Sequence, residues 1–234
     1  MEAAIRLWLV RHGETLDNHR QTIQGQHPRL GRISPKGLAQ ARAVGRALAN
    51  TPLDGVFCSP LERAVMTLTG ILAQRPGDQT LPLAFLDDLK EIDMGGLAGL
   101  PRQEYHDRAG SRPAGFKAPG GESWLDVQHR AGACLRQEMA ERKYRAVLMV
   151  SHAGVNRGLI ASLLGYNITE LWVPPDKDLP QTNGCINRIE LDARGRVISA
   201  VINDTIHLTG AAAPDKPSPC LIWNLTRRRF EPQS

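Results

Sequence analysis

Short runs of mainly apolar residues recur along the chain and predict the strands of a sheet. They occupy residues 5–10, 55–58, 81–86 and 146–150. A run of four to eight apolar residues bounded by polar or turn-forming positions is typical of a buried strand. The run at 146–150 is the clearest, and its lack of polar alternation favours a central parallel strand, because both faces of such a strand are covered.

Between these runs, apolar residues recur every three or four positions and predict helices. Ser34 and Pro35 suit the N-cap and the first position of one helix. The tetrapeptide Ser-Pro-Leu-Glu that begins at Ser59 has the form of a capping box and predicts a second helix capped by Ser59. Ser123 is expected to cap a third. The positions expected to face the core are Leu38, Ala41, Val44 and Leu48 in the first helix, and Trp124, Val127, Ala131, Leu135 and Met139 in the third.

The alternation of strands and helices predicts one α/β domain over residues 1–209. Its expected architecture is a three-layer sandwich, with a mostly parallel central sheet and helices on both faces. Residues 185–191 and 197–202 flank a turn and predict a closing hairpin. Residues 210–234 are expected to form a C-terminal tail, in which 220–225 is either an added edge strand or a docked terminus.

The composition is that of a soluble globular protein. Of the 234 residues, 41% are hydrophobic and 23% are charged, which is enough apolar material for a core without disulfides or a structural metal. No apolar run approaches the ~20 residues of a membrane span. The stretch at residues 3–10 lacks the basic front and cleavage site of a secretory signal. The four cysteines form no Cys-x-x-Cys pair, so we expect neither a zinc ribbon nor a redox dithiol, and a reducing cytoplasm fits best.

The charge balance is mildly basic. The 29 Lys and Arg residues exceed the 24 Asp and Glu residues by a formal charge of +5, and the one concentrated basic block is residues 227–229. Nucleic-acid-binding proteins usually gather basic residues into a stripe or a known module, so we expect no nucleic-acid partner. A small acidic substrate would explain the excess equally well, and charge alone does not decide the matter.

Two apolar strands end in a histidine that is closely followed by glycine. His12 follows the strand at 5–10, and His152 follows the strand at 146–150. Ligands of open α/β sheets collect outside the carboxyl ends of the strands, so the two imidazoles meet there if the strands are neighbours. No His-x-His, His-Glu-x-x-His or Cys/His cluster is present, and a metal site is not expected. The other histidines are interpreted as ordinary core or surface residues: His19, His27, His106, His129 and His207.

Two arginines accompany these histidines. Arg11 precedes His12, and Arg63 falls in the first turn of the helix expected after Ser59. Free N–H groups and the helix dipole favour an anion at that position. Either arginine alone is most simply a solvated surface charge. Together, two guanidiniums, two imidazoles and a helix start indicate a site for a phosphate dianion.

Short sequence blocks surround these residues in a characteristic order. They are LVRHGET at 9–15 with Asn18, QG at 24–25, SPKG at 34–37 leading to QA at 40–41, SPLERA at 59–64 with Thr67, LKEIDMG at 89–95 with Gly99, PGGES at 119–123, and SHAG at 151–154. Over residues 5–205 the series resembles that of the histidine phosphatase superfamily, the phosphoglycerate mutase-like proteins. The resemblance implies a phosphoglycerate mutase-like catalytic domain.

The resemblance also implies a role for each central residue. His12 is the nucleophile that becomes a phosphohistidine, while Arg11, Arg63 and His152 surround the phosphoryl group. The chemistry needs these residue types. An imidazole is nucleophilic only while the attacking nitrogen is unprotonated, so its other nitrogen must be held as a donor, typically to a backbone carbonyl. Fixed cations stabilise charge on the equatorial oxygens and can replace a magnesium ion. We therefore expect metal-independent catalysis without a cofactor.

A carboxyl group must also protonate the departing alkoxide and then activate water. Spacing alone does not choose among the four acids of the region, which are Asp87, Asp88, Glu91 and Asp93. The resemblance favours Glu91, because its distance from Gly95 and Gly99 matches the family block. The family blocks further imply these residues as substrate contacts: Asn18, Gln24, Gly25 and Ala153.

Departures from the family pattern bear on the reaction. Residues 27–33 form a short insertion that makes the expected rim more basic, which favours a substrate with a second anionic or hydrogen-bonding group. The stretch between Glu91 and His152 is shorter than the lid typical of cofactor-dependent mutases. A mutase must keep a bisphosphorylated intermediate away from water, so a smaller lid favours hydrolysis and the phosphatase branch.

The leading interpretation is a phosphomonoester hydrolase that acts through a phosphohistidine on a small phosphorylated metabolite. A cofactor-dependent phosphoglycerate mutase and a catalytically silent phosphate-binding module are the alternatives. Sugar phosphates, phosphoglycerates, nucleotides and ribazole phosphate all fit as substrates, because selectivity is expected to lie in residues 93–121 and 26–32. We expect a cytoplasmic monomer or homodimer whose partner is a small phosphate ester.

Overall fold

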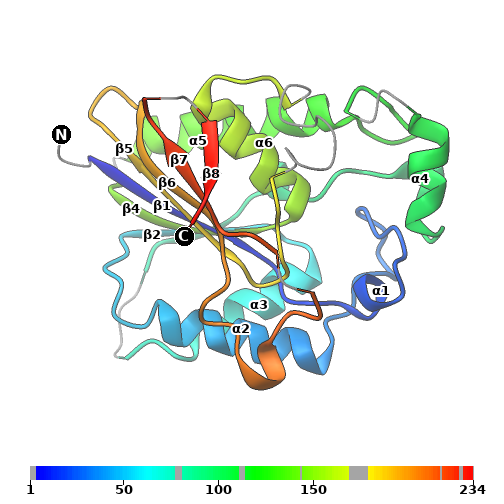
Figure 1. Ribbon diagram of the computed structural model, residues 1–234, viewed down its shortest axis with the longest axis horizontal. Helices are drawn as coiled ribbons and strands as arrows, with labels where there is room; N and C mark the ends of the chain where they lie inside the picture. The colour runs from blue at the N-terminus through cyan, green and yellow to red at the C-terminus, as the bar shows by residue number, and fades with distance from the viewer. Residues whose placement is uncertain are drawn as a thin grey trace.

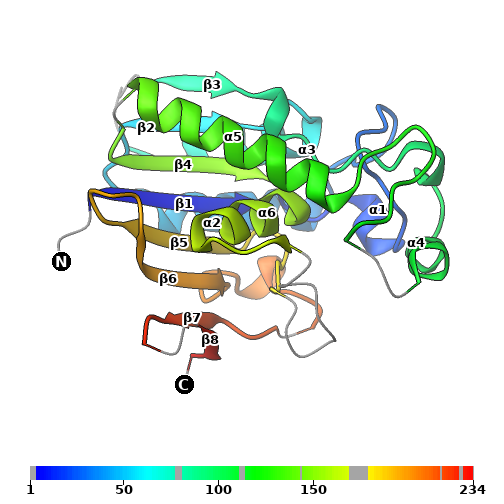
Figure 2. The same cartoon turned by 90° about the horizontal axis from the view of Figure 1, so that it is seen from above.

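The computed structural model describes residues 4–76, 81–110, 114–142, 144–168, 179–216, 218–226 and 229–233. Its centre is an eight-stranded sheet with the strand order β3-β2-β4-β1-β5-β6-β7-β8 (Figure 2). The strands are β1 Ile5–Arg11, β2 Gly55–Cys58, β3 Leu83–Phe85, β4 Ala146–Ser151, β5 Ile186–Leu191, β6 Val197–Asp204, β7 Leu221–Asn224 and β8 Arg229–Pro232. The α-helices are α1 Leu16–His19, α2 Pro35–Ala47, α3 Glu62–Leu72, α4 Arg102–Ala109, α5 Trp124–Arg142 and α6 Ala153–Leu164.

The sheet has a parallel half and an antiparallel half. Strands β3, β2, β4 and β1 are parallel neighbours, whereas the pairs from β1–β5 to β7–β8 are antiparallel. The expected α/β architecture and the hairpin β5–β6 are confirmed. The expectation of a mostly parallel sheet is wrong, because the hairpin and the C-terminal strands make the described sheet mixed.

Helices cover both faces of the parallel half. α2 and α3 lie on one face, and α5 and α6 lie on the other (Figure 1). Along β1, Leu7 and Leu9 belong to the core cluster under α5 and α6, whereas Trp8 and Val10 belong to the cluster under α2 and α3. Strand β4 lies between β2 and β1 and is packed in the same way. Burial on both faces explains why these strands are continuous apolar runs.

Two of the three predicted helix starts have the expected caps. The hydroxyl of Ser34 accepts a hydrogen bond from the N–H of Gly37 at 3.0 Å. Ser123 accepts from the N–H of Asp126 at 3.2 Å, and the Asp126 carboxylate accepts from the N–H of Ser123 at 2.9 Å. The predicted core positions of both helices are buried, except for Leu38 and Met139, which are partly buried.

The third predicted cap is wrong. Helix α3 begins at Glu62, and its N-cap is Leu61, which makes no side-chain capping bond. Ser59 stands two residues earlier and is fully buried. Its hydroxyl accepts a hydrogen bond from the N–H of Leu61 at 3.3 Å and has a closer partner in the site described below.

The C-terminal tail extends the sheet. Val201 of β6 pairs with Ile222 of β7, and β8 pairs with β7 in turn. Residues 220–225 therefore contribute an added strand, β7, rather than a docked terminus. Strand β8 pairs with the other side of β7 and forms the edge of the sheet. Residues 227 and 228 of the basic block lie outside the described residues.

Candidate active site

The carboxyl ends of β1 and β4 bring two distant histidines together. In these parallel neighbours Arg11 is paired with Ser151, and the N–H of His12 donates to the carbonyl of Ser151 at 3.0 Å. The ring centroids of His12 and His152 lie 5.1 Å apart. The side chains are buried, at 3% and 0% exposure. The prediction that the two strand ends meet is confirmed.

The ring of His12 is held in the orientation that nucleophilic attack needs. Its Nδ1 lies 2.7 Å from the carbonyl oxygen of Gly13. A carbonyl only accepts, so Nδ1 carries the proton and Nε2 keeps its lone pair. Burial lowers the pKa of His12 well below its ordinary value, and the charges of Arg63 and Arg11 lower it further. The imidazole is therefore neutral at neutral pH, as an attacking group must be.

His152 is fixed from both of its nitrogens. The Nε of Arg63 donates to Nδ1 of His152 at 3.2 Å, and Nε2 of His152 lies 2.8 Å from the hydroxyl of Ser59. Because Nδ1 accepts, Nε2 carries the proton and donates to Ser59. Burial lowers the pKa of His152 well below its ordinary value, with Arg63 and His12 adding to the effect. The second imidazole is thus also neutral.

Arg63 is the buried cation beside both rings. Its side chain is 3% exposed, and its Nη2 donates to the carbonyl of Gly25 at 2.8 Å. Burial lowers the pKa of Arg63 to about 10, while the charges of Glu91 and Asp17 oppose the change. The guanidinium therefore stays charged at neutral pH.

Arg11 is held from the opposite side. Its Nη1 donates to the carbonyl of Gln181, and burial together with the charge of Arg102 lowers its pKa to about 10. Arg11 Nε and Gln24 Oε1 are buried without a hydrogen-bond partner among the described residues. An unpaired buried polar atom costs about 1–3 kcal/mol. Both atoms belong to side chains that line the pocket described next.

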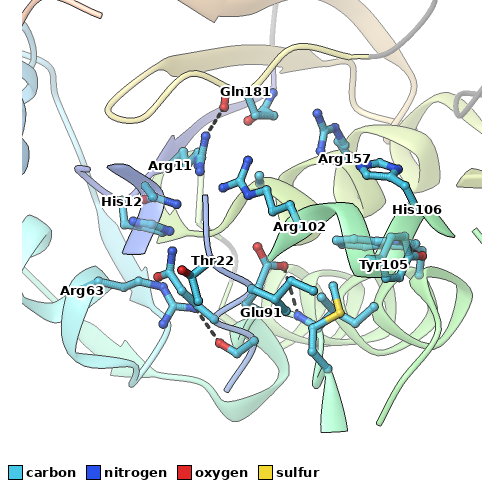
Figure 3. A pocket seen from close by; sticks show the side chains of 18 residues that line it. Arg11, His12, Thr22, Arg63, Glu91, Arg102, Tyr105, His106, Arg157 and Gln181 are labelled. Carbon is cyan, nitrogen blue, oxygen red and sulfur yellow. Dashed lines mark hydrogen bonds between the residues drawn. The ribbon is translucent and has the colours of Figure 1, made fainter. Parts of the chain in front are cut away.

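A pocket of about 350 Å³ opens beside these groups (Figure 3). Its wall includes all but one of the predicted site residues, namely Arg11, His12, Asn18, Gln24, Gly25, Arg63, Glu91 and Ala153. His152 is the exception, since its fully covered ring reaches Arg63 and Ser59 rather than the pocket wall. The catalytic roles given to these residues stay predictions.

Glu91 is the one acid among the described residues of the pocket wall. Its Oε1 accepts from the N–H of Ile92 at 3.0 Å, and its Oε2 accepts from the N–H of Gly154 at 3.4 Å. Gly154 has to be glycine, because a Cβ there would lie 1.9 Å from the Trp124 ring and 2.6 Å from the Glu91 carboxylate. This placement supports the choice of Glu91 over its acidic neighbours.

The amide of Asn18 is held in place at the pocket wall. Its Oδ1 accepts from the N–H of Thr15 and from Nδ2 of Asn183, each at 3.1 Å. The same Nδ2 donates to the carbonyl of His12 at 3.1 Å. Asn183, which sequence reasoning missed, therefore ties the nucleophile's backbone to Asn18.

Two cations of the pocket were missed by sequence reasoning. Arg102 comes from the first position of α4, and Arg157 comes from α6. Arg157 stands four residues after Ala153, and this spacing on one helix face could have identified it. Arg102 follows an irregular segment and carries no such signal. The remaining lining residues that were missed are Thr22, Ile23, Ile92, Met94, Tyr105, His106, Trp124 and Gln181.

The predicted basic rim at residues 27–33 is wrong, because none of these residues lines the pocket. The insertion instead packs behind Arg63. A Cβ on Gly31 would lie 2.7 Å from Nη1 of Arg63, and the N–H of Gly31 donates to Asp17 at 2.7 Å. The basic side of the pocket comes from α4 and α6.

A chain of buried amides supports Gln181, whose carbonyl holds Arg11. Nδ2 of Asn156 donates to Oε1 of Gln181 at 3.0 Å, and Nε2 of Gln181 donates to Oδ1 of Asn187 at 2.8 Å. The same Oδ1 accepts from the N–H of Asn203 at 3.0 Å. Nδ2 of Asn203 reaches the carbonyl of Pro219 at 3.0 Å, so the network extends from the pocket to the C-terminal tail.

Comparison with known proteins identifies the family. The family model described as the histidine phosphatase superfamily (branch 1) matches residues 7–204. The chain is 32% identical to the adenosylcobalamin/alpha-ribazole phosphatase of Salmonella typhimurium, over 72% of this chain and 84% of that protein. It is 32% identical to a 2,3-bisphosphoglycerate-dependent phosphoglycerate mutase of Methylobacterium radiotolerans, over 85% of this chain and 95% of that protein.

Comparison with solved structures supports the same family. The alpha-ribazole phosphatase of Shigella flexneri superposes with a TM-score of 0.70 at 26% identity, over 86% of this chain and 96% of that one. The chain belongs to the histidine phosphatase superfamily, and it is an enzyme of the phosphatase type. The resemblance noted in the sequence is confirmed. Among the described residues, no helix has the length and apolar character to cross a membrane.

Proposed function

We propose that this protein hydrolyses a small phosphomonoester through a phosphohistidine on His12. The observation that carries the proposal is the 2.7 Å contact between His12 Nδ1 and the Gly13 carbonyl, which leaves Nε2 free to attack in a pocket shared with two arginines. Sequence relatives with phosphatase activity support the reaction type.

In the first step, Nε2 of His12 attacks phosphorus and the bond from phosphorus to the leaving oxygen breaks. Arg11 and Arg63 hold the non-bridging oxygens and stabilise the charge that spreads over them. Glu91 gives its proton to the leaving oxygen, so the alcohol departs neutral. His152 acts indirectly, by fixing the guanidinium of Arg63.

In the second step, water attacks the phosphohistidine. The carboxylate of Glu91 takes a proton from this water, and the phosphorus–nitrogen bond breaks. Inorganic phosphate leaves, His12 returns to the neutral ring, and Glu91 is again protonated. Every group that the two steps need lies in the described pocket wall, so we expect turnover without a metal ion.

The test is a panel of phosphate esters that includes p-nitrophenyl phosphate, assayed with and without a chelator. We expect phosphate release that the chelator leaves unchanged. His12→Ala should lower kcat on the order of 10⁴-fold. The matched control is His129→Ala, an exposed residue of α5 outside the pocket. Full activity in His12→Ala, or strict dependence on added magnesium, would overturn the proposal.

The two alternatives give different results in the same panel. A mutase would convert 3-phosphoglycerate to its isomer in the presence of trace 2,3-bisphosphoglycerate, with little phosphate release. A silent binding module would bind vanadate but release no phosphate from any ester. The mutase relative keeps the first alternative in the test, whereas the smaller segment between Glu91 and His152 favours hydrolysis.

We also propose that the enzyme works in a reducing compartment such as the cytoplasm. All four cysteines are free, and three of them are buried: Cys58, Cys134 and Cys185. Thiol titration of the denatured, unreduced protein should give four thiols per chain. Monomer or homodimer stays a prediction, which light scattering would decide.

A further inference from the structure

The pocket carries more positive charge than one phosphate group needs. Four guanidiniums line it, those of Arg11, Arg63, Arg102 and Arg157, against the single carboxylate of Glu91. Both buried imidazoles are held neutral, so they add no charge of their own. A phosphomonoester carries a charge of about −2 at neutral pH. Four cationic side chains around one cavity favour a substrate that carries more negative charge than one phosphate group.

The four guanidiniums form two groups. Arg11 and Arg63 flank His12 and form the inner pair, whereas Arg157 lies across the cavity near His106 (Figure 3). Arg102 lies between Arg11 and Arg157 (Figure 3), and it forms the outer pair with Arg157. The inner pair has protein partners, the carbonyls of Gln181 and Gly25. The outer pair is brought together from α4 and α6, which are far apart in sequence.

Arg102 is the least satisfied of these cations. Its guanidinium makes no hydrogen bond or ion pair with any residue that the structure describes. Its pKa is lowered by burial and by the charge of Arg157, and only Glu91 opposes the change. Arg102 in turn lowers the pKa of Arg11. These like charges repel one another, so holding them around one cavity has a cost that an anion in the cavity would relieve.

The rest of the wall is mixed, and its polar side chains carry no fixed positive charge comparable with a guanidinium: Asn18, Thr22, Gln24, His106 and Gln181. Ile23, Met94, Tyr105 and Trp124 are buried and largely apolar. The Tyr105 hydroxyl accepts from Nε1 of Trp124 at 2.7 Å. Arg102 and Arg157 are therefore the strongest available donors for the part of the substrate that departs.

We infer that Arg102 and Arg157 form a second anion subsite, and that the substrate class is a phosphomonoester whose leaving group carries a carboxylate or a second phosphate. The inference rests on the proposed hydrolysis at His12. Planar guanidiniums suit both anions, since each offers paired oxygens to a fork of N–H donors. Arg157 is anchored by a 2.8 Å hydrogen bond from its Nε to the carbonyl of Leu179, and Arg102 is the free arm.

The experiment compares two matched substrates. 3-Phosphoglycerate and glycerol 3-phosphate differ in a carboxylate at the position where the second has a hydroxymethyl group. We expect the wild-type enzyme to prefer the first. Arg102→Gln should lower kcat/KM for 3-phosphoglycerate about 10- to 100-fold, mainly through KM, and lower it by a clearly smaller factor for glycerol 3-phosphate.

A charge-matched control lies on the same helix. Arg108 of α4 is exposed, pairs with Glu104 at 2.9 Å and does not line the pocket. Arg108→Gln removes the same net charge and should leave both substrates unchanged. The same variants assayed with fructose 1,6-bisphosphate and fructose 6-phosphate decide whether the subsite takes a second phosphate as well. Thermal melting of both variants checks that they fold.

The inference is overturned if Arg102→Gln leaves the preference between matched substrates unchanged, or if Arg108→Gln changes it equally. It is also overturned if neither second anion improves kcat/KM in the wild-type enzyme. If no ester is hydrolysed at all, the proposed function fails instead. The subsite is then tested by calorimetry, where 3-phosphoglycerate should bind more tightly than glycerol 3-phosphate and lose that advantage in Arg102→Gln.

Discussion

The inner and outer halves of the pocket are built differently. In the inner half, His12, Arg63 and His152 are at most 3% exposed, and each has a hydrogen-bond partner within the protein. In the outer half, Arg102 and His106 are exposed, and Arg102 has no partner among the described residues. The side chains of His12, Arg63 and His152 are therefore fixed before substrate binds, whereas the Arg102 guanidinium has no fixed partner within the described protein.

The difference in burial and hydrogen bonding separates the side chains suited to stabilising a transition state from those suited to selecting a leaving group. Groups that stabilise a transition state must not reorganise during the reaction, so they gain from burial and from fixed partners. Groups that select a leaving group must exchange water for ligand, so they belong at an exposed wall. We expect substitutions of the inner half to lower kcat, and substitutions of the outer half to raise KM for selected substrates.

After His12→Ala, the largest effect should follow from removing the Arg63 cation of the inner half. Arg63→Gln removes a donor to the phosphoryl group and to His152, and it should lower kcat for p-nitrophenyl phosphate about 10²- to 10³-fold. Because Arg63 also depresses the pKa of His12, the acid limb of the kcat/KM profile should move to higher pH. Arg42→Gln on the exposed side of α2 is the control. An effect confined to KM would contradict the distinction between the two halves.

The second effect concerns stability at low pH. The pKa values of His12 and His152 are well below 6.5 in the folded protein, so below pH 6.5 the unfolded chain takes up protons that the folded chain does not. Stability should therefore fall with falling pH below 6.5, by up to about 1.4 kcal/mol per pH unit for each ring. Urea unfolding across pH 7.5 to 5 measures the slope.

The histidine variants identify the source of that slope. His152→Asn should lose part of it, because the pKa values of His12 and His207 stay lowered. The exposed control His129→Asn should retain it. A slope unaffected by His152→Asn would mean that buried imidazoles do not govern acid stability.

The smallest effect tests the hydroxyl behind the inner half. Ser59→Ala leaves the Nε2–H of His152 buried without its 2.8 Å acceptor, at a cost of about 1–3 kcal/mol. We expect a lower melting temperature together with a roughly tenfold lower kcat, because the Arg63–His152 contact loosens. If Ser59 acted as a helix cap, kcat would stay unchanged. NMR of the His152 ring protons would show the lost hydrogen bond directly.

Predictions from short stretches of sequence were correct where the residues that form a contact belong to one strand end or one helix start. His12 and His152 each follow an apolar strand directly, so the carboxyl-end rule for parallel strands was enough to bring them together. The helix starts at Ser34 and Ser123 depend on contacts three residues along the chain and were likewise predictable. Glu91 was chosen by resemblance, and its solitary position among acids in the pocket wall supports the choice.

Predictions from short stretches of sequence were wrong where a residue contacts another residue that is distant in the sequence. The tetrapeptide at Ser59 has the form of a capping box, yet its hydroxyl contacts His152, and the helix begins later. Residues 27–33 are basic and close in sequence to Gln24, yet they pack behind Arg63 rather than into the pocket. A motif states which bonds a segment can make, and the packed structure decides between competing partners.

Sequence patterns were enough to predict the α/β architecture, the two strand-end histidines and the family, because each depends on residues within one strand, one helix or one motif. The antiparallel half of the sheet, the contact of Ser59 with His152 and the presence of Arg102 in the same pocket as Arg157 became known from the three-dimensional structure. The physical reason is that the position of α4 relative to α6 follows from packing of the whole chain. The sequence around Arg102 contains no pattern that predicts its position in the pocket wall.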